Sequence, residues 1–156
     1  MSDLSSTKYE NSNLFIDRLR TIKDGHTQKE LAEWLGISIT TLNGYFTGNS
    51  RPNLDFLVTL AKKGINLNWF ITGVGPLFID YPEYAIYTPE EQVFLHDLET
   101  EEGGITNKDE AIKSFRQLKE YQKHTNANKT EYVIGLKILK TTYGKRHQNI
   151  KTDTSL

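Results

Sequence analysis

A cluster of small side chains that form hydrogen bonds lies between positions 38 and 44. Its hydroxyl and carboxamide groups, with one branched apolar side chain among them, belong to Ser38, Ile39, Thr40, Thr41 and Asn43. The edges of base pairs in a DNA major groove offer donors, acceptors and the thymine methyl group. This set of residues therefore favours recognition of base edges through hydrogen bonds and one apolar contact.

The residues that usually perform catalysis are not grouped in a way that indicates an active site. In the second half of the chain, Ser114 falls inside an expected helix and Ser155 near the C-terminus, and neither has a strand-rich setting to hold it against a lysine base. No spacing typical of metal ligands relates the four histidines, His26, His96, His124 and His147. We expect no enzyme activity, no catalytic residue, no metal site and no cofactor.

A short helix is expected directly before this cluster, from Gln28 to Leu35. Thr27 is in the N-cap position and Glu30 follows three residues later, which is the capping-box arrangement. Gly36 comes next, and glycine adopts the left-handed conformation of a helix C-terminus without a steric cost. The chain is therefore expected to turn at this glycine.

A second helix is expected after the turn, with Ser38 as its N-cap. Leu42 and Tyr45 lie three residues apart on one face of it, where they can pack on Leu31 and Leu35 of the first helix. The hydrogen-bonding residues are then left on the outer face, away from the shared core.

The same stretch resembles the helix-turn-helix of the lambda-type phage repressor family, the Xre-like regulators. The resemblance depends on Gln28, Ala32, Gly36, Gly48, Pro52 and the apolar run 54–61. The later segment 67–78, LNWFITGVGPLF, is similar to the end of phage-repressor helix-turn-helix domains. Together the two motifs cover roughly residues 14–78, about half of the chain.

The resemblance implies a five-helix domain that binds an operator in double-stranded DNA. It also implies a role for Gln28 as an anchor on a phosphate, and for Asn49 and Arg51 in the following loop as contacts to the DNA backbone. Ser38, Thr40, Thr41 and Asn43 would read bases or adjoining phosphates, and Ile39 would meet a thymine methyl group. Many members of this family also carry a self-cleaving peptidase domain, which we do not expect here.

The composition of the chain limits which covalent links, metal sites and membrane segments it can contain, and how strongly it can bind DNA. The chain has 156 residues, a net charge of −1 and no cysteine, which excludes disulfides and thiolate metal sites. No apolar run approaches the roughly 20 residues of a membrane span, so a cytoplasmic protein is expected. Residues 1–80 hold eight basic and eight acidic residues. Because phosphate contacts dominate affinity for DNA, we expect modest affinity per protomer and dependence on a dimer.

The expected organisation is all-α. A mobile tail at 1–11 precedes the DNA-binding domain at 12–79, a linker at 80–87, a small, mainly helical oligomerisation region at 88–143 and a flexible tail at 144–156. The apolar stretch 130–143 fits both a helix and a strand by its periodicity, and a helix is favoured.

Self-association is expected in this C-terminal region, because three helices of this size bury little apolar surface on their own. The residues expected at the contact are Tyr132, Val133, Leu136 and Leu139. The alternative is a small independent bundle without a partner.

The resulting hypothesis is a phage-repressor-like transcriptional repressor that binds an inverted-repeat operator as a dimer or higher oligomer. An antirepressor protein would be a further partner. The alternative is a protein-interaction module, such as an antitoxin or adaptor, that keeps the helix-turn-helix only as a scaffold. The sequence does not separate a repressor from an activator.

Overall fold

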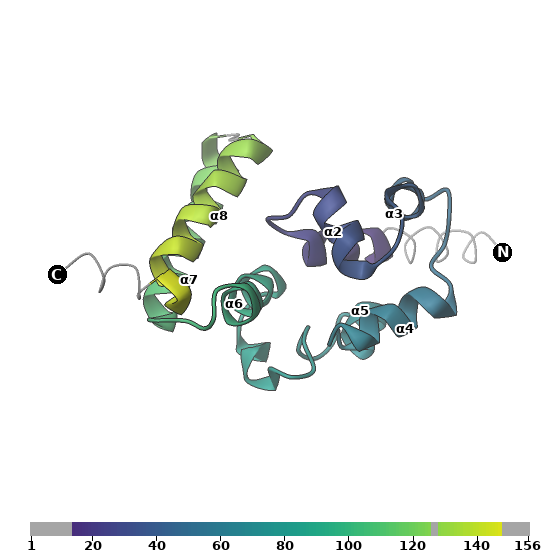
Figure 1. The fold of residues 1–156 in the computed structure, drawn as a ribbon, viewed down its shortest axis with the longest axis horizontal. Helices are drawn as coiled ribbons and strands as arrows, with labels where there is room; N and C mark the ends of the chain where they lie inside the picture. The colour runs from purple at the N-terminus through teal and green to yellow at the C-terminus, as the bar shows by residue number, and fades with distance from the viewer. Residues whose placement is uncertain (1–13, 126–127, 148–156) are drawn as a thin grey trace. The chain divides into compact units, whose positions relative to one another are not determined.

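A computed structural model describes residues 14–125 and 128–147. The named elements within these residues are all helices, which confirms the all-α expectation. The chain divides into two compact units, 1–92 and 93–156, with the division inside helix α6 (Figure 1). The expected N-terminal tail, 1–11, lies entirely outside the described residues. The expected C-terminal tail, 144–156, lies outside them from residue 148 onward.

The first unit contains a helix whose described part is 14–23, followed by four short helices and a 3-10 turn. Their bounds are α2 (Gln28–Leu35), α3 (Ile39–Thr47), α4 (Leu54–Lys62), α5 (Leu67–Thr72) and η1 (Pro82–Ile86). Leu19, Leu42 and Leu60, from three different helices, are fully buried in the core of this unit.

Aromatic rings fill the centre of the first unit. Phe15 contacts Tyr45, Phe56 and Phe70 edge to face, with ring centroids 5.3 to 6.5 Å apart. Trp69 is 4% exposed, so it is a core residue and not a surface aromatic. Rings from four helices therefore hold α3 and α5 against the same core.

A short antiparallel bridge closes this unit. Ile65 pairs with Phe78, supported by a hydrogen bond from Asn66 N to Leu77 O at 2.8 Å. Segment 80–87, which was expected to be a linker, holds the η1 turn, in which Tyr84 is 2% exposed and stacks on Tyr81. The division of the chain into domains stays a prediction.

The second unit is formed by the later part of α6 (Pro89–Glu101), α7 (Lys108–Thr125) and α8 (Lys129–Tyr143), followed by the short 3-10 helix η2 (Lys145–His147). The favoured helix for 130–143 is confirmed. The helix starts follow local signals, since Thr88 and Glu91 at α6 form a reciprocal capping box and Asn107 Oδ1 accepts from Glu110 N at α7.

Two residues that were expected at an oligomer contact are buried in the core of the second unit. Tyr132 and Leu136 are 5% and 3% exposed, and they pack with Phe94, Leu98 and Phe115 of the same unit. α7 and α8 pack side by side and bury this face of α8. The assignment of Tyr132 and Leu136 to an oligomer contact is therefore corrected, whereas self-association of the region stays a prediction.

The same unit contains a buried ion cluster. Lys140 Nζ lies 3.1 Å from Asp97 Oδ2 and 3.4 Å from Glu101 Oε2. Burial lowers the pKa of the Lys140 ammonium, but the attraction of the Asp97 and Glu101 carboxylates outweighs it, so the pKa lies above its usual value. The lysine therefore stays charged and ties the end of α8 to α6.

Candidate nucleic-acid interface

The corner between α2 and α3 is built from three local signals in the sequence. Thr27 Oγ1 accepts a hydrogen bond from Glu30 N at 3.1 Å and caps α2. Gly36 ends α2 with a φ of 70°, and Ser38 Oγ accepts from Thr41 N at 3.1 Å and caps α3. The predicted start and end of α2, the turn and both caps are confirmed.

α2 and α3 pack against each other (Figure 1), and Leu42 and Tyr45 on α3 and Leu31 and Leu35 on α2 are all buried, as predicted. The four side chains are between 0% and 5% exposed. This packing determines how α3 is rotated about its own axis. It therefore decides which side chains α3 presents to solvent.

The outer face of α3 is exposed over its whole length. Ile39 is 46% exposed, and Thr40 and Asn43 are both exposed. Positions 39, 43 and 47 follow one another at helical spacing, so Thr47 belongs to the same face, although the sequence reasoning left it out. A search for exposed small residues at intervals of four would have found it.

Two expected DNA contacts meet across the corner. Gln28, the first residue of α2, donates a hydrogen bond from Nε2 to Asn43 Oδ1 in α3, 15 positions along the chain. Gln28 is half-buried and Asn43 is exposed. The contact fixes the Asn43 carboxamide at the edge of the face that α3 presents.

Ser38 and Thr41 form hydrogen bonds with each other at the start of α3. Besides accepting from the Thr41 amide, the Ser38 hydroxyl donates to Thr41 Oγ1 at 2.8 Å. Thr41 points about 160° around the helix axis from Asn43 if each residue advances by about 100°. The two hydroxyls therefore lie at the start of α3, and Thr41 points almost opposite to Asn43 on the outer face.

The loop after α3 is held close to the helix by Gly44. A β-carbon at this position would lie 2.4 Å from Ser50 Oγ, and Ser50 N donates to Gly44 O at 3.1 Å. Only a glycine allows this close approach without a rearrangement. The expected backbone contacts in this loop, Asn49 and Arg51, are exposed next to the end of α3.

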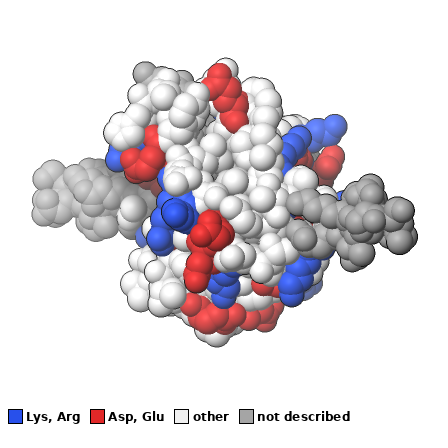
Figure 2. Space-filling view, turned by 90° about the vertical axis from the view of Figure 1, so that its left-hand side faces the viewer, with Lys and Arg blue, Asp and Glu red and all other residues white. Residues whose placement is uncertain are grey.

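Few cationic side chains surround α3. Lys29 and Arg51 are exposed in the flanking segments, whereas Lys23 Nζ lies over the Phe46 ring at 5.3 Å from the ring centroid. Figure 2 draws the left-hand side of the view in Figure 1, where acidic and basic side chains are interspersed among the described residues. Hydrogen bonds must therefore supply a large share of any selectivity for DNA.

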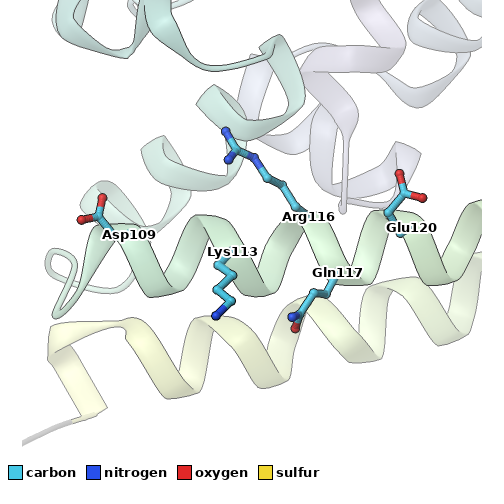
Figure 3. A pocket seen from close by; sticks show the side chains of 5 residues that line it. All are labelled: Asp109, Lys113, Arg116, Gln117 and Glu120. Carbon is cyan, nitrogen blue, oxygen red and sulfur yellow. The ribbon is translucent and has the colours of Figure 1, made fainter.

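Outside this interface, charged side chains gather around two histidines and on the surface of α7. His26 and His124 each pair with one glutamate a helical turn away, Glu30 at 3.1 Å and Glu120 at 3.0 Å. A shallow depression on α7 is lined by Asp109, Lys113, Arg116, Gln117 and Glu120, whose side chains point in different directions (Figure 3). This diverging set of opposite charges does not converge on one ligand.

Residues 16–63 match the family model described as Helix-turn-helix. Over these residues the chain is similar to helix-turn-helix domains of the Xre, lambda-repressor-like kind. The helix-turn-helix match spans α2, α3 and α4, which include the exposed face and the loop described above, and it supports a DNA-binding regulator. No curated protein and no solved structure was found to match the chain. None of the helices in residues 14–125 and 128–147 has the length and apolar character needed to cross a membrane.

Proposed function

We propose that this protein is a sequence-specific transcriptional repressor of the phage-repressor type, which binds an inverted-repeat operator in the cytoplasm. The observation that carries the proposal is the outer face of α3. This face lies within the segment that matches the helix-turn-helix model. It is formed by four exposed residues that do not pack in the core, namely Ile39, Thr40, Asn43 and Thr47. Small polar groups on a protruding helix suit close approach to base edges.

Each expected contact has a separate role in this proposal. Thr40 and Asn43 read base edges, and Ile39 contacts a thymine methyl group. Gln28, Ser38, Thr41, Asn49 and Arg51 form the surrounding contacts to phosphates and sugars, which set the register on the duplex. Because α3 itself carries no basic residue, these flanking groups provide much of the affinity.

The proposal includes a dimer, because an inverted repeat presents two equivalent half-sites about 34 Å apart, one helical turn of DNA. Self-association is assigned to α8, as expected from the sequence, with Val133 and Leu139 partly buried in this helix. Ile134 and Ile138, one turn apart on α8, are 53% and 60% exposed and extend the apolar area that a second copy would cover. An antirepressor protein that binds the second unit remains part of the proposal as a route to induction.

The second candidate function is a protein-interaction module of the antitoxin or adaptor kind. It is favoured by one observation, the net charge of −1 with no basic residue on α3. Such a module would retain a protein partner in stoichiometric amount and would not retain DNA. A pull-down with and without nuclease treatment separates the two functions.

Selection from a pool of random duplex DNA tests the proposed function. The expected product is an inverted repeat whose half-sites lie one helical turn apart, bound by two copies of the chain as determined from the mass of the complex. Footprinting on the selected duplex should give protection with two-fold symmetry. Protection without this symmetry, or no enrichment at low salt, contradicts the proposal.

A further inference from the structure

The outer side of α4 carries a row of exposed apolar side chains. Leu54 is 74% exposed and Val58 is 42% exposed, and Ala61 is exposed as well. Since each helical residue advances by about 100°, these three side chains lie within about 60° of one another around the helix axis. The buried residues of α4, Phe56 and Leu60, lie on the other side. The three exposed residues are called the α4 apolar row below.

Two opposite charges flank the α4 apolar row on the same side. Asp55 is in the first turn of α4 and Lys62 in the last turn, and both are exposed. They point about 100° and 80° around the axis from Leu54, so they share one flank. Seven residues correspond to about 10.5 Å along the axis, which is too far for them to pair with each other. Neither forms an ion pair within the residues that the structure describes.

This pattern is complementary to itself when the helix is reversed. If a second α4 runs antiparallel across a two-fold axis at Val58, Leu54 lies within about one residue of Ala61 of the second copy. A large side chain opposite a small one lets the two helices approach closely. A two-fold axis of this kind also brings equal flanks of the two helices together. Asp55 therefore lies beside Lys62 of the second copy, and this ion pair occurs twice.

We propose that the α4 apolar row contacts a second copy of this chain when two copies occupy the two half-sites of one operator. An antiparallel contact of α4 with itself and an inverted repeat share two-fold symmetry. The inference rests on the proposed function and is separate from the self-association assigned to α8. A stable interface buries about 800 Å² per partner, more than three such side chains provide. The contact is therefore weak in the free protein and makes binding to the second half-site cooperative.

Cysteine crosslinking tests the position of the two-fold axis. The chain has no cysteine, so a single introduced thiol gives an unambiguous result. Val58→Cys places two equivalent β-carbons at the axis, where a disulfide can join them. Lys62→Cys is the matched control, because it is exposed on the same helix but its two copies lie about 12 Å apart along the axis. On the selected duplex, oxidation should crosslink Val58→Cys at least about tenfold faster than the control.

Reversal of the flanking charges tests the ion pairs. The readout is the ratio of the affinity for the complete inverted repeat to the affinity for a duplex with one half-site, both from fluorescence anisotropy. This ratio removes each variant's own effect on DNA contacts. Asp55→Lys or Lys62→Asp alone places like charges together and should lower the ratio by about fivefold. An equal mixture of the two variants, and the chain with both changes, should regain the wild-type ratio because opposite charges face each other again.

Three results would overturn the inference while an inverted repeat bound by two copies leaves the proposed function standing. They are equal crosslinking of the two cysteine variants, a chain with both charge changes that behaves like the single variants, and crosslinking of Ile134→Cys on α8 without crosslinking at position 58. If no duplex is selected, the proposed function fails. The contact is then decided by oxidation of Val58→Cys at high protein concentration without DNA, where equal rates for this variant and Lys62→Cys contradict it.

Discussion

Replacement of Ser38 separates the stability of α3 from its affinity for DNA. Ser38 Oγ accepts from Thr41 N and donates to Thr41 Oγ1, so the change to alanine removes both contacts at the start of the recognition helix. Loss of an N-cap costs about 1 kcal/mol. Ser38 is exposed and water replaces the second contact, so the total expected decrease in the free energy of unfolding is about 1 to 1.5 kcal/mol.

Two further replacements at the same position are informative. Glycine is an acceptable N-cap and should cost only a few tenths of a kcal/mol. Aspartate keeps an acceptor for the Thr41 amide and its charge interacts favourably with the helix dipole, so Ser38→Asp should be as stable as the wild type or slightly more stable. An acidic group about 6 Å from a phosphate should nevertheless cost about 0.7 kcal/mol of binding energy in water, roughly threefold in affinity, for every sequence.

Tryptophan fluorescence during urea unfolding provides the stability assay. The chain has two tryptophans, Trp34 on α2 and Trp69 on α5, and both lie in the first unit. The expected order of stability is aspartate, serine, glycine and then alanine, whereas the aspartate variant should bind DNA most weakly of those that remain folded. Equal stability of the serine and alanine proteins, within about 0.3 kcal/mol, would refute the capping role.

Two other perturbations test the loop and the second unit. Arg51→Ala should weaken binding to all duplexes alike and reduce the slope of log affinity against log salt by about 1, as measured by anisotropy titrations; a change confined to one base pair would contradict a phosphate contact. Lys140→Met should destabilise the chain by about 3 kcal/mol at pH 7, because it removes the ammonium group that lies beside the buried Asp97 carboxylate, and the additional change Asp97→Leu should restore most of the loss. Since the folded pKa of Lys140 lies above its usual 10.5, its stabilisation is fully present below pH 10.5 and is lost as the pH rises through the folded pKa, so circular dichroism melts should show the difference between wild type and variant shrinking there.

The corner around Gly36 could be predicted because its signals are local. Thr27 and Ser38 cap helices through amides three residues ahead, and a left-handed glycine needs only its own φ to end a helix. Each of these interactions is contained within about four residues of sequence. The predicted bounds of α2 therefore agree with the structure residue for residue.

The contacts between distant segments could not be predicted in this way. The approach of Ser50 to Gly44 and the bond from Gln28 to Asn43 exist only after α2, α3 and the following loop have packed. The position of Gly44 in the sequence does not reveal that its lack of a side chain makes room for Ser50 of the loop. Sequence periodicity reports which residues share a face and not which neighbour covers that face.

The need to know distant neighbours also explains why Tyr132 and Leu136 of α8 were expected at an oligomer contact but are buried within their own unit. Helical spacing groups Tyr132, Leu136 and Lys140, but it does not reveal that α7 covers this face and that Lys140 enters the core with Asp97 as its partner. The more exposed apolar residues, Ile134 and Ile138, lie on another side of the helix. An amphipathic helix with apolar residues on two sides needs its neighbours to be known before an interface is assigned.

The affinity of the Thr40→Ala/Asn43→Ala variant for selected and scrambled duplexes shows whether the outer face of α3 reads the DNA sequence. Both side chains are exposed on α3, so the variant should unfold at the same urea concentration as the wild type. Thr141→Ala, an exposed threonine on α8, is the matched control and should bind like the wild type. The α3 variant should bind both duplexes with nearly equal affinity. If it stays folded and still prefers the selected duplex as strongly as the wild type, the outer face of α3 does not read the DNA sequence.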